Sequence, residues 1–216
     1  MTDVKAEPRQ AKMEQAYFEL RRALEAGEYA SNEHLVELPL SKSLGISRNT
    51  LRAVLTRLEQ EGFIVLEPNR GARVRAFTLE EARDALRARE VLEGLVCRLA
   101  AERATAAQKK ELRSLIDAAE AALAGDDLTA FTHANRHFHV LLVDIADSPM
   151  ASSMLDSIHF PMMKFQFQST LVPGRKNMVS GEHGQIVEAI ERGDADEAER
   201  IGRWHVRQIQ NTLDRL

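Results

Sequence analysis

The 216-residue sequence contains one cysteine, Cys97, and few aromatic side chains, which make up 5% of the chain. A single cysteine excludes an intrachain disulfide and a four-cysteine zinc site, and it favours a reducing compartment, so we expect a cytoplasmic protein. Long apolar runs are also missing, because the most apolar short stretch, residues 140–143, ends at Asp144 and is far too short to cross a bilayer. The polar N-terminus MTDVKAEPRQAK lacks the apolar core of a signal peptide, so we expect no membrane partner.

The chain has no overall basic excess. Its net charge is −4, so any nucleic-acid binding would depend on a local patch. What is present is an ordinary soluble mixture of 44% hydrophobic and 29% charged residues, rich in the helix formers Ala, Leu, Glu and Arg. Residues 1–76 carry a net charge of +1 and residues 77–216 one of −5. We therefore expect a mainly α protein with two domains, 1–76 and 77–216.

The first domain follows the pattern of a winged helix-turn-helix. Apolar residues lie on one helical face over 16–24, a short helix fits 37–44, and a third helix fits 48–61. Ser47 is a suitable N-cap for the third helix. Residues 63–67 and 72–76 are then predicted to be strands joined by a Pro-Asn-Arg-Gly turn. Three helices followed by a β-hairpin are typical of the winged helix-turn-helix.

The second domain is predicted to be helical throughout. Glycine and proline divide it into segments whose periodicity fits helices at about 79–103, 106–124, 127–146, 149–170, 178–192 and 194–215. Helices of this length with short connections favour an all-α antiparallel bundle.

A local basic patch falls on the predicted second and third helices. Residues 38–58 contain no acidic side chain, although any single arginine there would also suit a solvated face. Arg and Asn can read guanine and adenine, and Ser and Thr at a helix N-terminus suit phosphate. A glycine in the wing lets the backbone approach a minor groove. The predicted contacts to DNA are Lys42, Ser47, Arg48, Asn49, Thr50, Arg52, Arg70, Gly71 and Arg73.

The stretch LSKSLGISRNTLRAVLTRLEQEGFIVLEPNRGARV resembles the DNA-binding domain of GntR-superfamily transcriptional regulators. Matching features are Leu44-Gly45, Ser47-Arg48, Glu61-Gly62 and Gly71-Ala72-x-Val74. The sequence departs from the family pattern where Asn49-Thr50-Leu51 replaces Thr-Pro-Val, where Ala53 replaces Glu, and where Ser31-Asn32 replaces Pro-Gly. The resemblance implies a transcriptional regulator that binds double-stranded operator DNA. Because one recognition helix reads only a few base pairs, we expect a homodimer on a palindromic site.

Three predicted helices of the second domain each direct a histidine toward the bundle interior. His183 and His205 lie on apolar stripes, and His139 lies about 40° from Asn135 at the edge of a third stripe. One buried histidine is commonly satisfied by a carbonyl, but three with a nearby Asn favour a divalent metal ion, with zinc or nickel suited to imidazole. The predicted ligands are Asn135, His139, His183 and His205. His133 and His137 are predicted to point away.

This second domain resembles the FCD effector domain of the FadR branch of the same superfamily. The matching residues are Arg89, Leu92 and Glu93 in its opening helix, Asn135-x-x-x-His139, and a closing pattern from Glu182-His183 to His205. With six expected helices rather than seven, the domain is similar to those of the family's shorter, VanR-like subgroup. The resemblance implies that the metal anchors a small carboxylate effector.

We expect Arg89 to make a second contact to that carboxylate, although a surface salt bridge to Glu93 explains the residue equally well. The main functional hypothesis is thus a transcriptional regulator, not an enzyme, whose operator affinity responds to the effector. Two alternatives stay open, a metal sensor in which the ion is the signal and a metalloenzyme. The second is disfavoured because no HExxH-like motif supplies an acid or base.

Overall fold

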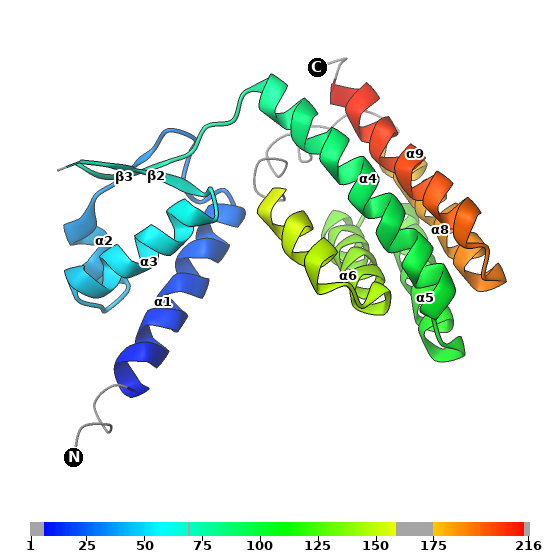
Figure 1. Ribbon diagram of the computed structural model, residues 1–216, viewed down its shortest axis with the longest axis horizontal. Helices are drawn as coiled ribbons and strands as arrows, with labels where there is room; N and C mark the ends of the chain where they lie inside the picture. Colours follow the sequence, from blue (N-terminus) through cyan, green and yellow to red (C-terminus); the bar gives the residue numbers. More distant parts are fainter. Residues whose placement is uncertain (1–6, 69, 159–174, 214–216) are drawn as a thin grey trace. The chain divides into compact units, whose positions relative to one another are not determined.

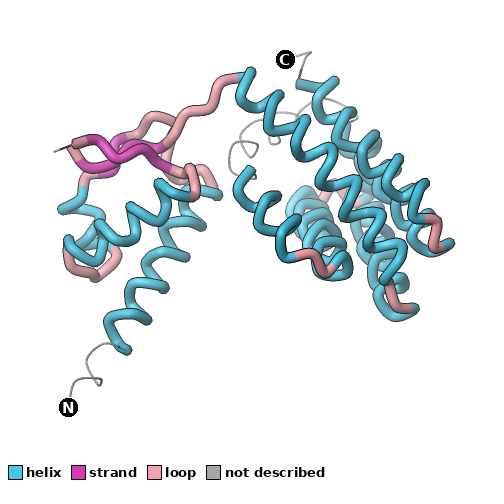
Figure 2. The backbone as a smooth tube through the Cα atoms, viewed as in Figure 1, coloured by secondary structure: helices cyan, strands magenta, loops and turns pink. Residues whose placement is uncertain are grey.

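A computed structural model describes residues 7–68, 70–158 and 175–213. The chain divides into two compact units, Met1–Thr78 and Leu79–Leu216. Among the described residues, strands occur only in the first unit, and the second is built from helices (Figure 2). The mainly α fold class predicted from the sequence is therefore confirmed. None of the helices that the structure describes is long and apolar enough to cross a membrane.

The N-terminal unit contains three helices and a small sheet (Figure 1). Its elements are α1 (Glu7–Glu25), β1 (His34–Leu35), α2 (Glu37–Ser43), α3 (Arg48–Gln60), β2 (Ile64–Glu67) and β3 (Gly71–Val74). The strands are antiparallel in the order β1-β3-β2. The predicted helices and hairpin are present, whereas β1 was not predicted, because two residues carry no readable alternation.

The third helix, α3, is defined by its cap and by one apolar face. The Ser47 side chain accepts a hydrogen bond from the Thr50 backbone N–H at the helix start. Leu51, Val54 and Leu58 are buried beneath it, so the opposite face, with Arg48, Asn49 and Arg52, is left exposed. Burial of one stripe therefore determines which side chains of α3 are free for a partner.

The C-terminal unit consists of helices in the described residues. These are α4 (Leu79–Arg103), α5 (Ala106–Ala124), α6 (Leu128–Ala146), the helical residues 149–158, α8 (Arg175–Arg192) and α9 (Ala195–Leu213). The bounds of α4 and α5 match the predicted ranges. The predicted helix 149–170 is observed as far as 158, and its remainder lies outside the described residues. The helix expected at 178–192 begins earlier, at Arg175.

The bundle core is shared by α4, α5, α6, α8 and α9. Buried side chains from these helices include Cys97, Leu112, Phe138, Ile186 and Ile201. Two glycines allow α4 and α9 to pack closely, since a Cβ at Gly202 would lie 2.7 Å from Cys97 Sγ and one at Gly94 would lie 2.6 Å from Arg203 Cγ. This packing holds the inner faces of the helices together.

Candidate metal centre and nucleic-acid interface

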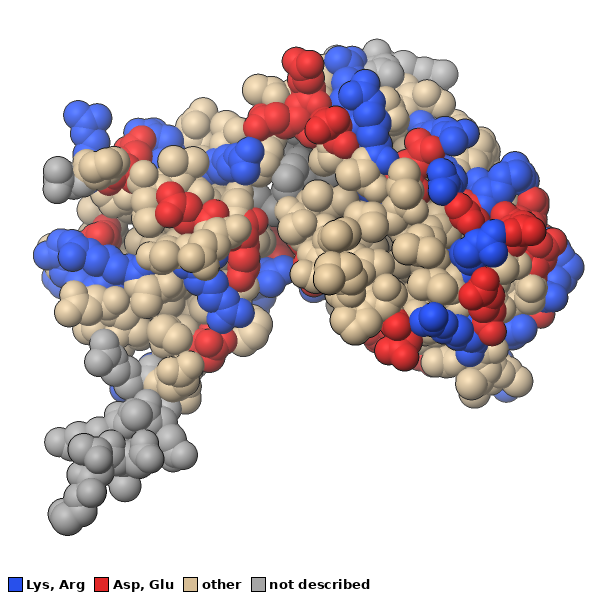
Figure 3. All heavy atoms as spheres, viewed as in Figure 1, with Lys and Arg blue, Asp and Glu red and all other residues tan. Residues whose placement is uncertain are grey.

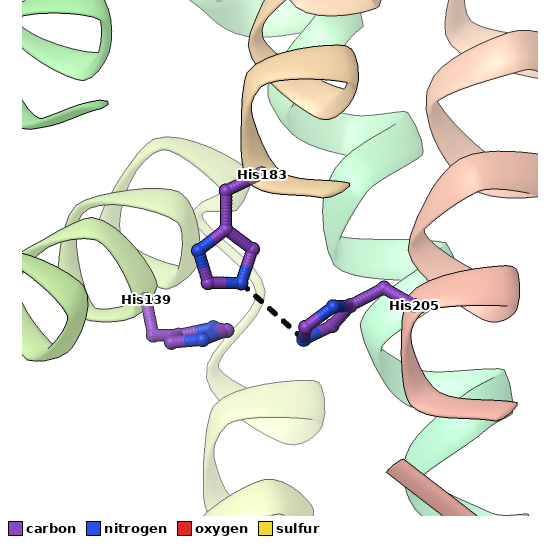
Figure 4. Close-up of side chains that lie close together, drawn as sticks. All are labelled: His139, His183 and His205. Atoms are coloured by element: carbon purple, nitrogen blue, oxygen red, sulfur yellow. Dashed lines mark hydrogen bonds between the residues drawn. The ribbon is translucent and has the colours of Figure 1, made fainter. Parts of the chain in front are cut away.

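Three histidines from three helices meet inside the C-terminal unit (Figure 4). His139 belongs to α6, His183 to α8 and His205 to α9. One ring nitrogen from each lies within 4.8 Å of the others, and His183 and His205 are buried while His139 is half-buried. The structure thus brings together three of the four residues that the sequence suggested as ligands.

The ring nitrogens are spaced and oriented for a metal ion. His183 Nε2 and His205 Nε2 are 3.3 Å apart, and two nitrogens bound tetrahedrally to zinc are separated by about 3.3–3.4 Å. Glu182 Oε2 accepts a hydrogen bond of 2.6 Å from His205 Nδ1. A proton on Nδ1 leaves the Nε2 lone pair of His205 directed at the cluster. Phe138 stacks on the His183 ring with centroids 4.4 Å apart, which further orients that ring.

Glu182 was recognised from the sequence only as part of the closing FCD-like pattern, and no role in the site was predicted for it. Helical phase turns it about 100° from its neighbour His183, and charged residues are seldom buried, yet only 2% of Glu182 is exposed. The one available signal was a carboxylate directly beside a predicted ligand, since metal-binding histidines commonly donate their second N–H to a carboxylate.

Asn135 lies one turn before His139 on α6 and offers an oxygen. Its Oδ1 is buried and has no hydrogen-bond partner in the described part of the chain. Both residues are half-buried where the sequence suggested a buried face, because they lie at the edge of the apolar stripe. His133 and His137 are exposed on another side of α6, with ring centroids 5.2 Å apart.

A buried ion pair lies in the same unit. Arg89 Nε donates to Glu93 Oε1 at 2.5 Å, and the two side chains are only 7% and 11% exposed, so the salt bridge considered from the sequence is internal. Burial acts to raise the pKa of Glu93, but the positive charge of Arg89, followed by His139 and His205, outweighs it and lowers the pKa to about 2. Arg89 Nη1 is buried without a hydrogen-bond partner in the described residues.

The exposed face of α3 carries polar residues at its N-terminus. Arg48, Asn49 and Arg52 are exposed, and basic side chains gather over the α2–α3 end of this unit (Figure 3). Ser47 and Thr50, suggested as phosphate contacts, make a 2.8 Å hydrogen bond between their hydroxyls. Thr50 is buried, so the structure accounts for these two residues by helix capping.

One acidic residue reaches this surface. Glu37 directly precedes the acid-free segment 38–58. In the folded protein its side chain contacts two arginines within that segment, Arg48 and Arg52. Its carboxylate accepts hydrogen bonds from Arg48 Nη2 at 3.1 Å and from Arg52 Nε at 3.0 Å. The hydrogen bond from Arg52, opposed by partial burial and aided by Arg48, lowers the pKa of Glu37. Arg48 and Arg52 follow Glu37 by 11 and 15 positions, so the periodicity of a single helix does not predict these contacts.

The remaining predicted DNA contacts lie on α2 and on the wing, which is the hairpin of β2 and β3. Lys42 and Arg70 are exposed, whereas Arg73 donates to Glu67 at 2.9 Å and to the Asn32 carbonyl at 2.7 Å. Gly71 has φ +92°, and a Cβ there would lie 2.8 Å from the backbone oxygen of Leu35. The close approach of Gly71 to the β1 backbone therefore explains the need for glycine at this position without any contact to DNA.

Both units match known families. The model of bacterial regulatory proteins, gntR family, matches residues 12–74 and the FCD domain matches residues 84–208. The chain is 25% identical over 209 residues to the HTH-type transcriptional repressor RspR of Escherichia coli (strain K12), an alignment that covers 97% of this chain and 92% of that protein.

Solved structures share the fold. The structure titled E. coli McbR/YncC has a TM-score of 0.79 at 19% identity and covers 94% of this chain and 97% of its own. A GntR family member from Pseudomonas syringae pv. tomato str. DC3000 has a TM-score of 0.52 at 21% identity, covering 95% and 86%. With both domain models matched in order, the chain belongs to the GntR family of bacterial transcriptional regulators and carries a C-terminal FCD domain.

Proposed function

We propose that this regulator binds palindromic operator DNA as a homodimer through α3 and the wing. We further propose that a small carboxylate effector, bound at a divalent metal centre in the C-terminal unit, controls its affinity for the operator. The observation that carries this proposal is the cluster of His139, His183 and His205. Asn135, one turn before His139 on α6, adds a buried oxygen that has no hydrogen-bond partner in the described residues. Zinc and nickel both accept this set of ligands.

The donor set fits a metal ion in its chemistry and in its surroundings. Three imidazoles and one amide oxygen are neutral ligands, and the carboxylates of Glu182 and Glu93 place negative charge near them. Such charge favours a divalent cation over an empty cluster of buried rings. When bound, the ion would supply positive charge and vacant positions for an oxygen ligand.

Arg89 supports the choice of a carboxylate as effector. Its guanidinium is buried, and Glu93 accepts only from Nε, so Nη1 is left without a partner in the described residues. A buried unpaired N–H is costly, and a carboxylate is the natural acceptor for a guanidinium. Arg89 would therefore hold one end of an effector inside the unit.

The metal site is tested by elemental analysis of purified protein. We expect about one divalent ion per chain in wild type and a loss of that ion in His139→Ala and His183→Ala. His137→Ala is the matched control, because His137 is an exposed histidine on the same helix as His139. A stoichiometric ion that persists in both cluster variants would refute the site.

Control by the effector is tested on DNA. Operator binding is titrated with metal alone and then with a panel of small mono- and dicarboxylates, in wild type and in Arg89→Ala. We expect a change in operator affinity only with a carboxylate present, and a smaller response in the variant. A full response to metal alone would instead identify a metal sensor, and turnover of any of these compounds would identify an enzyme.

A further inference from the structure

The first residue of α2, Glu37, joins two arginines of the exposed face of α3. Arg52 donates through Nε at 3.0 Å and through Nη2 at 3.1 Å, and Arg48 donates through Nη2 at 3.1 Å. The Glu37 side chain is 17% exposed, whereas those of Arg48 and Arg52 are 57% and 59% exposed. A largely covered carboxylate thus holds two guanidinium groups that stay accessible.

The bonds to Arg52 use one edge of its guanidinium. The group has five N–H donors in a planar fork, and Glu37 engages the side edge formed by Nε and Nη2. The end edge, formed by Nη1 and the second proton of Nη2, is still able to donate two parallel hydrogen bonds. This is a geometry that can chelate guanine O6 and N7.

Glu37 lies at the start of α2 and close to the wing. A Cβ at Gly71 of β3 would lie 3.9 Å from Glu37 Cγ, so the stem of Glu37 lies against the strand as its carboxylate meets α3. The backbone of Glu37 belongs to the first turn of α2, so its carboxylate reaches Arg48 and Arg52 from a helical position.

We propose that Glu37 is a positioning residue for base reading, which holds Arg52, and more weakly Arg48, in the orientation that chelates guanine. The proposal rests on the proposed DNA-binding role of α3. A fixed arginine loses less conformational freedom when it binds, while a carboxylate near DNA repels phosphate and weakens binding to every sequence. Glu37 thereby exchanges general affinity for discrimination between sequences.

The test begins with a duplex selected by wild-type protein from a random-sequence library, and a scrambled duplex of the same composition. For Glu37→Gln we expect the affinity for the selected duplex to fall about three- to tenfold and the affinity for the scrambled duplex to stay equal or rise. A repeat of the selection with Glu37→Gln should show weaker guanine preference at the positions that Arg52→Ala also relaxes.

Matched variants separate this role from folding and from simple charge. Glu28→Gln removes one negative charge from an exposed site in the same unit and should leave the ratio of the two affinities unchanged. The double variant Glu37→Gln/Arg52→Ala should discriminate no worse than Arg52→Ala alone. A thermal melt of each variant confirms that the unit is folded.

Several outcomes would overturn the proposal. Equal losses on both duplexes would indicate a structural role only, and equal gains would indicate simple repulsion. If the guanine preference persists in Arg52→Ala, Arg52 does not read guanine, and Glu37 cannot act by orienting it. The DNA-binding proposal fails separately, if wild type enriches no sequence or Arg48→Ala binds the selected duplex as tightly as wild type.

Discussion

At the scale of single residues, Arg48 is the side chain that we propose reads a base. It lies at the first position of α3 and is exposed. We expect Arg48→Ala to cost about 1–3 kcal/mol on a selected operator and to relax the base preference there. Lys42→Ala should weaken selected and scrambled duplexes alike, as a phosphate contact does. Fluorescence anisotropy at one salt concentration measures the affinity of each variant for the two duplexes. If Arg48→Ala prefers the selected duplex over the scrambled one as strongly as wild type does, Arg48 does not read a base.

Glu182 is expected to determine how tightly the histidine cluster holds a metal. Its carboxylate accepts from His205 Nδ1, which fixes the tautomer and directs the Nε2 lone pair of His205 toward the cluster. Glu182→Gln should weaken metal affinity about 10- to 100-fold, as measured by competition with a coloured chelator. Glu188→Gln, at an exposed position of the same helix, should leave the affinity unchanged. Equal affinities in the two variants would show that the hydrogen bond does not support the site.

The residues that the sequence made visible are those whose position depends on one helix alone. Helical phase separates His139 from His137, because the turn of a single helix determines which face each occupies. The roles of Glu37 and Glu182 were not predicted, for the opposite reason. Glu37 acts on side chains of a different helix, and Glu182 reaches His205 across a helix pair. Such pairings depend on tertiary packing, which periodicity does not report.

At the scale of elements, the contact between α4 and α9 depends on glycine. A Cβ at Gly202 would lie 2.7 Å from Cys97 Sγ and 3.3 Å from the Glu93 backbone oxygen. Gly202→Ala should therefore push the helices apart and destabilise the unit by about 1–3 kcal/mol. Gly181→Ala is the control, since a Cβ there meets nothing within 4 Å and should gain up to about 1 kcal/mol in helix propensity. Urea unfolding of both variants tests this, and equal effects would contradict it.

The ion pair within α4 should make stability depend on pH. Glu93 has a pKa of about 2 in the folded protein, against an ordinary value of 4.5, so the unfolded chain binds its proton first as the pH falls. The stabilisation is fully present above about pH 4.5 and is lost as the pH falls toward 2. We expect Glu93→Gln to be less stable than wild type at pH 6, with the difference narrowing by pH 3.5. Urea unfolding of metal-free protein measures it, and a difference independent of pH would contradict the assignment.

The prediction of elements succeeded where helical periodicity is long and clear. Helix α5 begins after Thr105, whose side chain forms a capping box with Gln108, and its bounds match those expected. The strand β1 has two residues, His34 and Leu35, and exists because β3 offers it backbone partners. A pairing that short leaves no pattern in the sequence.

At the scale of the whole molecule, the proposed DNA contacts and the histidine cluster belong to separate units. Arg48 lies in Met1–Thr78 and His139 in Leu79–Leu216. Effector binding in one unit and DNA binding in the other are then linked by a coupling free energy. A substitution can abolish this coupling while each unit stays folded. We expect His139→Ala to bind a selected operator as tightly as effector-free wild type and to ignore the carboxylate that wild type senses. A DNA-binding titration measures both properties, and a loss of operator binding itself would contradict this separation.

Assembly is the remaining property of the whole molecule, and it follows from how little DNA one helix can read. A single recognition helix contacts only a few base pairs, so useful specificity requires two copies related by a two-fold axis. The C-terminal unit is the expected interface, because the exposed face of α3 must stay free for DNA. Sedimentation at micromolar concentration should give twice the 24.2 kDa chain mass, and selected duplexes should contain inverted repeats. Inserting five base pairs between the half-sites turns one by about half a helical turn and should abolish binding by the dimer. A chain that sediments as a monomer with and without the selected duplex would overturn this assembly.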